Sequence, residues 1–295
     1  MQYIGLASGT TAGSVLTHPV GKLDIVEIEP AAEPAAQLFD FVNGRPLDDP
    51  RTTLSFADAR SFLRGTEKLY DVIISEPSNP WMAGPANLFT QEFFEIGSRA
   101  LRDGGLFTQW IQLYTLDAEL LRSAIATFRS VFPYVYAFHP LRKNDLILVG
   151  SETPIELDVA RLGARWQVPA VQSDLACLGF HELAVVLAQA RLGPDEVAAL
   201  STGARINTDD NGLLLFGAPL SVHSSTTVLN DRLLGATARG VGNYLCFPGA
   251  TREVEGNFLS YLAAAYGASG FSLEAAVTER LADERRERFR NEPGG

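Results

Sequence analysis

The sequence is poor in cysteine and histidine, which argues against a disulfide-rich protein and against a metalloprotein. It contains two cysteines, Cys177 and Cys246, and four histidines among 295 residues. The cysteines are far apart and form no CxxC pair, so we expect neither a disulfide framework nor a zinc site. We interpret both as buried apolar residues. The histidines form no HExxH-type cluster, and we therefore predict no metal.

Long apolar runs and a basic start are also lacking. No apolar stretch reaches the roughly 18 residues that a membrane-spanning helix needs. The first residues lack the basic region of a signal peptide. We therefore expect a cytoplasmic location. Residues 2–7 already look like a core strand with no lead-in, which is typical of a fragment or of a chain that has lost an upstream domain.

Positive charge is scarce relative to negative charge. The chain has 24 Lys and Arg against 35 Asp and Glu, a net charge of −11. Such a chain lacks the basic surface of a nucleic-acid binder, so we expect no nucleic-acid partner. A negative cleft concentrates cations and would suit a cationic substrate. A solubilising surface is the plainer interpretation of most of this charge.

The first half of the chain contains an alternation of strands and helices. We expect five strands at residues 4–6, 23–29, 52–57, 70–75 and 106–112, and an antiparallel hairpin at 134–139 and 145–150. This pattern predicts an α/β fold with a doubly wound, mostly parallel sheet of seven strands. A terminal antiparallel hairpin on such a sheet is typical of nucleoside-dependent transferases, by fold-level analogy.

After residue 150 the pattern changes to Ala- and Leu-rich helices. We predict helices at 175–192, 228–237, 257–266 and 276–290, the last one laced with charge and facing solvent. The sequence Asn-Thr-Asp-Asp at 207–210 predicts a turn in which polar side chains cap the backbone. We place a domain boundary after residue 150, with a mainly helical C-terminal region over 151–295.

A glycine-rich turn follows the first strand and precedes a helix. Its residues Gly5, Ala7, Ser8 and Gly9 would let a ligand approach the backbone and the N–H groups at the helix start. The spacing differs from GxGxxG. A tight turn without a ligand is therefore an equally good interpretation.

Acidic residues follow three of the predicted strands. Glu27 lies near the end of the second strand, roughly 20 residues past the glycine turn, where a carboxylate can bind both hydroxyls of a ribose. Asp58 follows the third strand and either caps the next helix or accepts a hydrogen bond from an adenine. Glu76 follows the fourth strand, at the edge where open α/β sheets bind ligands. Pro77 and Pro80 stiffen its loop.

The first half of the chain resembles the spermidine synthase (polyamine aminopropyltransferase) family. The resemblance covers residues 1 to about 150, with a weaker similarity at 207–210, and rests on the strings IGLASGTTAG, VEIEP, DDPRTTLSFADARSFL, YDVIISEPSNPW and NLFTQEFFE, followed by LFTQW. It implies a sheet of the S-adenosylmethionine-dependent methyltransferase type. Residues 1–150 would form a nucleoside-binding transferase domain without the family's N-terminal β-domain.

The resemblance is to the bacterial kind that occurs alone or fused behind a membrane transporter-like region. An upstream membrane region would explain a chain that opens on its first strand. The resemblance also makes a homodimer an expectation.

The resemblance implies a reaction and assigns residues to it. The family moves an aminopropyl group from decarboxylated S-adenosylmethionine to a polyamine amine. Glu76 takes the place of the catalytic acid and Glu27 that of the ribose-binding acid. Asp58 and Ala59 match the adenine-binding pair, and Gln109 matches a pocket glutamine.

Three further residues are candidates for contact with the amine substrate. Asn79 and Trp81 lie on the loop after Glu76, and Tyr114 follows the fifth strand. An aromatic face attracts a cationic amine. Packing beneath the loop is the alternative for both aromatic residues.

Two departures from the family pattern keep other functions open. Ser8 stands where the family's glycine turn carries an Asp that binds the free amine of the donor. Asn79 stands where its acidic loop carries a second Asp. Each charge-assisted hydrogen bond lost is worth roughly 1.5–3 kcal/mol. Ordinary S-adenosylmethionine would fit beside Ser8, so a methyltransferase and a non-catalytic nucleoside-binding domain remain alternatives.

Overall fold

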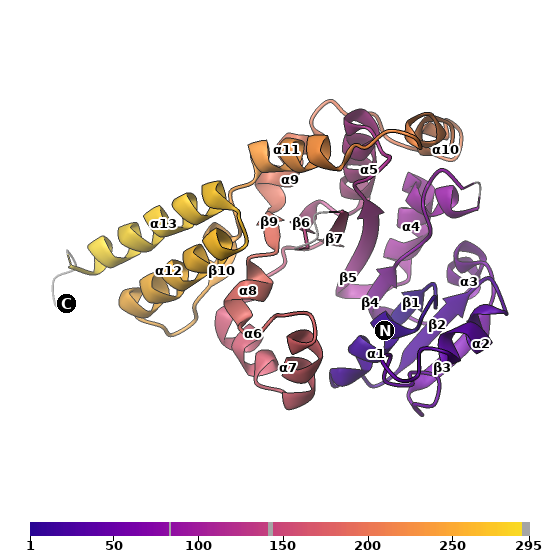
Figure 1. Cartoon of the computed structure of the whole chain (residues 1–295), viewed down its shortest axis with the longest axis horizontal. Coiled ribbons are helices and arrows are strands. Elements are labelled where there is room, and N and C mark those ends of the chain that lie inside the picture. Colours follow the sequence, from indigo (N-terminus) through magenta and orange to yellow (C-terminus); the bar gives the residue numbers. More distant parts are fainter. Residues whose placement is uncertain (83, 141–143, 291–295) are drawn as a thin grey trace.

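The computed structural model describes residues 1–82, 84–140 and 144–290, with an eight-stranded sheet at its centre (Figure 1). The strand order is β3-β2-β1-β4-β5-β7-β6-β9. The strands are β1 (Gln2–Ile4), β2 (Leu23–Glu27), β3 (Thr52–Phe56), β4 (Tyr70–Ser75), β5 (Leu101–Gln112), β6 (Tyr134–Phe138), β7 (Asp145–Ser151) and β9 (Ala190–Leu192). A separate parallel pair joins β8 (Leu157–Asp158) to β10 (Leu245–Cys246).

The doubly wound α/β fold is confirmed, and the strand count is corrected from seven to eight. Strands β1 to β5 are parallel, while β7 and β6 are antiparallel as expected. The eighth strand, β9, pairs with β6 and falls within residues 175–192, which we expected to be helical. Within this range α7 (Pro169–Ala176) ends and the short helix α8 (Leu183–Leu187) follows before β9. A short apolar run does not distinguish helix from strand by its periodicity.

One face of the sheet is covered by helices with aromatic side chains. Alternation along β5 points Phe107, Gln109 and Ile111 to this face. Five phenylalanines from α4, β5 and the C-terminal end of α5 pack there, with ring centroids 4.9–6.5 Å apart across eight pairs. The helices of the first half are α1 (Thr10–Thr17), α2 (Ala32–Gln37), α3 (Ala59–Gly65), η1 (Pro85–Phe89), α4 (Gln91–Arg99) and α5 (Ala118–Val131).

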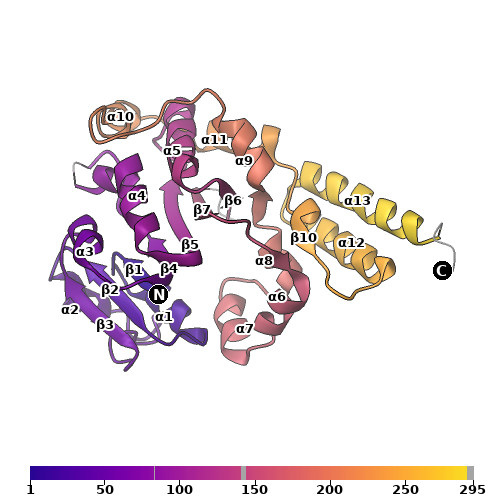
Figure 2. The same ribbon diagram turned by 180° about the vertical axis from the view of Figure 1, so that it is seen from behind.

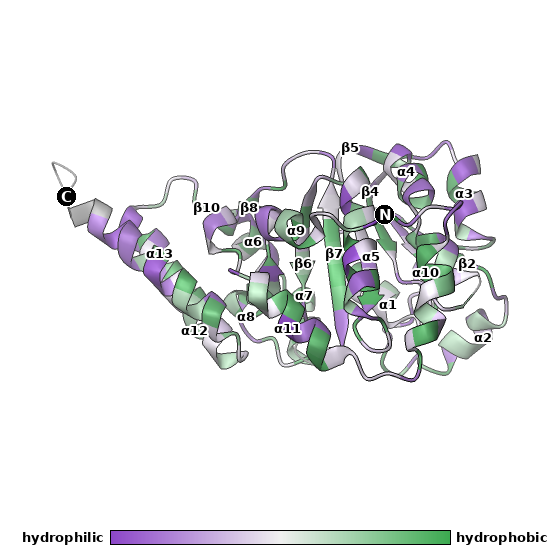
Figure 3. Ribbon diagram, turned by 90° about the horizontal axis from the view of Figure 1, so that it is seen from above, coloured by the Kyte–Doolittle hydropathy of each residue, from purple (hydrophilic) through white to green (hydrophobic). Residues whose placement is uncertain are grey.

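The second half adds helices that extend away from β2 and β3 (Figures 1 and 2). The hairpin of α12 and α13 forms one end of the molecule, and the outer part of α13 is hydrophilic (Figure 3). Helices α9 and α11 instead pack against α5. The division after residue 150 remains a prediction. The remaining helices are α6 (Val159–Trp166), α7 (Pro169–Ala176), α9 (Pro194–Ser201), α10 (Leu213–Gly217), η2 (Ala218–Ser221), α11 (Thr227–Thr237), η3 (Gly242–Tyr244), α12 (Arg252–Ala268) and α13 (Ser272–Arg290).

A buried arginine on β9 joins the sheet to the terminal hairpin. Arg191 donates to Glu274 at 2.6 Å and to Asp231 at 3.0 Å, and lies 2.8 Å from Nδ1 of His139. Its guanidinium carbon lies 4.2 Å from the ring centroid of Phe271. Because these groups neutralise and solvate a buried cation, we interpret His139 as structural.

The prediction of two buried cysteines is wrong, because both side chains are exposed. Cys177 ends α7, where its thiol donates to the Ser173 carbonyl at 3.3 Å. Cys246 lies on the short surface strand β10. Within the described ranges, no helix combines the length and apolar character needed to cross a membrane.

Candidate functional site

The glycine turn lies at the carboxyl edge of the sheet and has left-handed backbone. Gly5, Ala7 and Gly9 have φ values of 93°, 44° and 75°. A Cβ added to Gly5 would lie 3.0 Å from the carbonyl oxygen of Glu76, so the two strand ends approach closely only because position 5 is glycine. Gly9 precedes α1, whose first N–H groups face this turn.

Glu27 holds the glycine turn in place. Its Oε2 accepts the N–H of Leu6 at 2.7 Å, and its Oε1 accepts the N–H of Glu29 at 2.9 Å. The side chain is half-buried. A carboxylate has about four acceptor positions, so these two bonds leave capacity for the two hydroxyls of a ribose.

Two hydroxyl groups fix the orientation of the Glu76 carboxylate. Tyr3 donates to its Oε2 at 2.9 Å and Thr11 donates to the same oxygen at 3.0 Å. Oε1 makes no hydrogen bond to a described residue. Burial, and then the charge of Glu76, raise the pKa of Tyr3, so its hydroxyl remains a donor. The half-buried carboxylate is thus held in one orientation with one oxygen available to a ligand.

Asn43 fastens the other side of the glycine turn, and the sequence predicts no role for it. Its Nδ2 donates to the carbonyls of Ser8 at 2.9 Å and Ala36 at 3.0 Å. A Cβ on Gly13 would lie 1.8 Å from the Asn43 carbonyl oxygen, so α1 and this loop are in backbone contact. The Asn-Gly dipeptide at 43–44 predicts only a turn, because the partners of Asn43 come from distant positions.

The remaining donor-side residues lie around this edge. Asp58 is exposed and caps α3, where it accepts the N–H of Ser61 at 2.8 Å. The capping interpretation is confirmed, and its role toward adenine stays a prediction. Ala59 is the first residue of α3 and is buried. Ser8 Oγ lies 2.9 Å from Thr10 Oγ1, so hydroxyl groups occupy this part of the turn.

The structure brings together three of the predicted substrate-contacting residues. The Tyr114 hydroxyl donates to Asn79 Oδ1 at 3.3 Å, and the Trp81 and Tyr114 rings meet edge to face at 6.3 Å. Trp81 and Tyr114 are both half-buried. Burial, and then the charge of Asp145, raise the pKa of Tyr114. This arrangement provides an aromatic and amide surface where the loop after Glu76 meets the end of β5.

Gln109 and Gln112 lie on opposite faces of the sheet. Gln109 is fully buried on the face that α4 and α5 cover, and it donates to the Trp110 carbonyl at 3.1 Å. Gln112 lies on the face of Tyr3, and neither polar atom of its buried side chain has a hydrogen-bond partner among the described residues. An unsatisfied buried amide is costly. Sequence reasoning missed Gln112, although strand alternation distinguishes it from Gln109.

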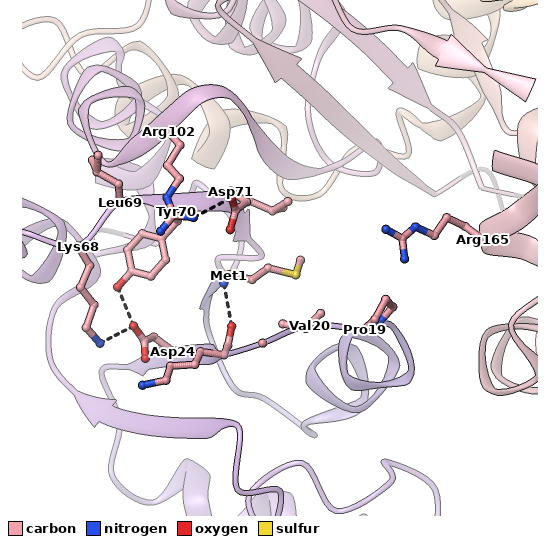
Figure 4. Close-up of a pocket in the computed structure, with 13 residues that line it drawn as sticks. Met1, Pro19, Val20, Asp24, Lys68, Leu69, Tyr70, Asp71, Arg102 and Arg165 are labelled. Carbon is pink, nitrogen blue, oxygen red and sulfur yellow. Dashed lines mark hydrogen bonds and ion pairs between the residues drawn. The ribbon is translucent and has the colours of Figure 1, made fainter. Parts of the chain in front are cut away.

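A cavity of about 860 Å³ lies at the opposite, amino edge of the sheet (Figure 4). Its charged groups are largely paired, because Lys68 contacts Asp24 at 2.7 Å and Arg102 contacts Asp71 at 3.1 Å. Tyr70 also donates to Asp24 at 2.9 Å. None of the predicted site residues lines this cavity, and we assign no chemistry to it. Within the described parts of the chain, no cluster of His, Cys, Asp or Glu could hold a metal ion.

Comparisons with known proteins match the same half of the chain. Residues 3–146 match the family model of the spermine/spermidine synthase domain. Putrescine N-methyltransferase 2 of Nicotiana tabacum is 34% identical over 132 residues, which cover 44% of this chain and 37% of the relative. The polyamine aminopropyltransferase of Korarchaeum cryptofilum is 33% identical over 104 residues, 35% of this chain and 32% of the relative. The chain thus spans about a third of the length of these relatives.

A solved structure with a related description is also similar. The probable spermidine synthase of Corynebacterium glutamicum aligns with a TM-score of 0.49 at 19% identity, over 71% of this chain and 72% of that chain. The fold assignment stands independently on the strand order and directions described above. The similarity to the spermine/spermidine synthase domain thus covers residues 3–146, just under half of the chain.

Proposed function

We propose that this chain transfers an aminopropyl group from decarboxylated S-adenosylmethionine to an amine of a polyamine. The observation that carries the proposal is the orientation of Glu76, whose carboxylate is held by Tyr3 and Thr11 at the carboxyl edge of the sheet. The family match over residues 3–146 supports the same reaction. No metal is required, because the sulfonium of the donor is already a good leaving group.

The donor would bind over the ends of β1, β2 and β3. Gly5, Ala7, Ser8 and Gly9 allow its close approach, and Glu27 would accept hydrogen bonds from the two ribose hydroxyls. The adenine would lie near Asp58 and Ala59 at the start of α3. Each contact is a proposal that follows from the position of these groups around one edge.

The acceptor amine would then attack the propyl carbon bonded to sulfur. A carbon–nitrogen bond forms as the carbon–sulfur bond breaks, and its electron pair passes to sulfur, which leaves as neutral methylthioadenosine. Glu76 Oε1 takes the proton that the attacking nitrogen loses. Asn79, Trp81, Gln109 and Tyr114 are the proposed acceptor-side residues, and in-line positioning supplies most of the rate.

Methyl transfer from ordinary S-adenosylmethionine is the second candidate. Ser8 and Thr10 place hydroxyl groups in the part of the turn where the family resemblance implies an acid. A neutral turn would tolerate the donor carboxylate. The similarity to a putrescine N-methyltransferase supports this candidate too. Binding of a nucleoside without turnover is the remaining alternative.

Calorimetry and product analysis separate these candidates. Methylthioadenosine, S-adenosylmethionine and its decarboxylated form are titrated into the protein. Each donor is then incubated with putrescine. We expect binding of methylthioadenosine, and its release from the decarboxylated donor. If none of the three nucleosides binds, the proposal fails, and binding without turnover indicates a non-catalytic domain.

A cytoplasmic location, a homodimer and an upstream membrane region are also proposals, supported by the family resemblance. Sedimentation analysis tests the dimer. Fractionation of cells that express the natural protein tests the location and the membrane association.

A further inference from the structure

The polar turn at 207–212 contacts the first half of the chain, and the proposed reaction assigns it no role. Its residues are Asn207, Thr208, Asp209, Asp210, Asn211 and Gly212. Local bonds shape it as a capping turn, since Thr208 N–H donates to Asn211 Oδ1 at 3.1 Å. The other contacts of Asn207 and Asp209 reach distant elements.

Asn207 is 1% exposed and bonds to four other elements, η1, α4, α5 and α10. Its Nδ2 donates to the Phe89 carbonyl at 2.9 Å, and its own carbonyl accepts the N–H of Gln91 at 2.9 Å. Its N–H donates to Thr127 Oγ1 on α5 at 2.8 Å, and its Oδ1 accepts the N–H of Leu214 on α10 at 3.1 Å. Every polar group of this residue is therefore used.

Asp209 adds a second attachment on the surface. Arg60 on α3 donates to both carboxylate oxygens, one of them at 2.8 Å. The Asp209 N–H donates to Glu92 Oε2 on α4 at 2.9 Å. Fork-like arginine pairs of this type fix geometry as well as charge.

These bonds fall at one end of the loop that carries Asn79 and Trp81. The loop begins after β4, where the N–H of Glu76 donates to the Ile4 carbonyl at 3.2 Å. It ends at Phe89, which is buried in the core and bonded to Asn207. The strands therefore fix the start of the loop, and the 207–212 turn fixes its end.

We propose that the 207–212 turn is a latch that positions the loop between β4 and α4, with Asn207 and Asp209 as positioning residues for the acceptor amine. The expected effect on amine kinetics rests on the proposed function, whereas the positioning of the loop does not. We expect that loosening the latch weakens use of the amine more than donor binding. Glu27 and the glycine turn do not touch the latch, and on the donor side it bonds to Arg60, which follows the proposed adenine residues Asp58 and Ala59.

The test compares Asp209→Asn with Asp49→Asn. Asp49 forms a similar two-oxygen pair with Arg51, at 2.9 and 2.7 Å, outside the loop between β4 and α4. We expect Asp209→Asn to lower kcat/KM for the amine by roughly 10-fold, mostly through KM, with a smaller change in methylthioadenosine binding. Asp49→Asn should leave both unchanged, and Asp209→Glu should restore most of the loss.

A readout that needs no turnover keeps the latch testable if the proposed function is wrong. In a W110F/W166F background, Trp81 is the remaining tryptophan. We expect Asp209→Asn and Asn207→Asp to increase acrylamide quenching of Trp81, and Asp49→Asn to leave it unchanged. Absence of turnover in the parent protein contradicts only the proposed function. Unchanged quenching in both latch variants, or unchanged amine kinetics in an active protein, overturns the latch.

Discussion

The donor side and the acceptor side of the candidate site are held in place in different ways. On the donor side, Glu27 bonds to Leu6 in the glycine turn, and Glu76 bonds to Tyr3 on β1 and Thr11 on α1, so neighbouring strand ends support one another. On the acceptor side, Asn79 and Trp81 lie on a loop whose far end is fixed by Asn207. The donor side is therefore positioned by the first half of the chain, whereas the acceptor side also depends on residues from the second half.

The largest expected effect is on Glu76, where the two sides meet. Glu76→Gln removes the proton acceptor and keeps the shape, so we expect kcat to fall roughly 10²–10⁴-fold. Methylthioadenosine binding should persist, because Glu27 and the glycine turn are unchanged. Glu67→Gln, at an exposed acid in the turn before β4, is the control. Full activity of Glu76→Gln would contradict the role of Glu76 as the proton acceptor.

The donor side should be sensitive to small changes in its backbone contacts. Gly13→Ala forces α1 away from the Asn43 carbonyl, and overpacking of this kind costs roughly 1–3 kcal/mol in the free energy of unfolding. We also expect weaker methylthioadenosine binding. Gly21→Ala, where an added Cβ meets nothing within 4 Å, is the matched control. Urea denaturation and calorimetry measure both effects. Equal behaviour of the two variants would contradict the proposed role of this contact.

Tyr114→Phe should affect use of the amine but not donor binding, and by less than the preceding variants. It removes the hydroxyl that donates to Asn79 at 3.3 Å and keeps the ring against Trp81. A single neutral hydrogen bond is worth about 0.5–1.5 kcal/mol, so we expect kcat/KM for the amine to fall by a similar free energy. Calorimetry should show unchanged donor binding. A change in donor binding without a change in amine kinetics would reverse this assignment.

The smallest expected effect is the pH dependence of the latch. The hydrogen bonds from Arg60 hold the pKa of Asp209 below its usual value of 3.8. Because the folded-state pKa is lowered, the pair stabilises the fold above the unfolded value and loses this contribution as pH falls through the folded value. Asp209→Asn should therefore flatten the acid side of a stability profile measured by urea denaturation. An unchanged slope below about pH 4 would show that the pair contributes no stability.

The sequence was sufficient to predict the sheet because its strands are short apolar runs that end in turns and acids. Glu27 and Glu76 could be placed at one edge, since parallel strands end together. The structure bears out the capping role of Asp58. It brings Tyr114 against Asn79 and Trp81, and their contact with the amine stays a prediction.

Other features could not be predicted because they depend on long-range contacts. Asn43 bonds to Ser8, and Tyr3 and Thr11 bond to Glu76. These partners are distant in the sequence and become visible only in the folded structure. Strand β9 was missed because its three residues are stabilised by β6 and by the buried ion pairs of Arg191. Residues 207–212 were predicted to form a turn. Their bond to Phe89 could not be predicted, because Asn207 and Phe89 are 118 residues apart in the sequence.

The most direct test offers both donors together with putrescine and identifies the products by mass spectrometry. The account predicts methylthioadenosine and an aminopropylated amine from the parent protein, and roughly 100-fold less or lower still of both products from Glu76→Gln. Adenosylhomocysteine with a methylated amine would contradict aminopropyl transfer and establish the methyl-transfer candidate. Consumption of neither donor would contradict both.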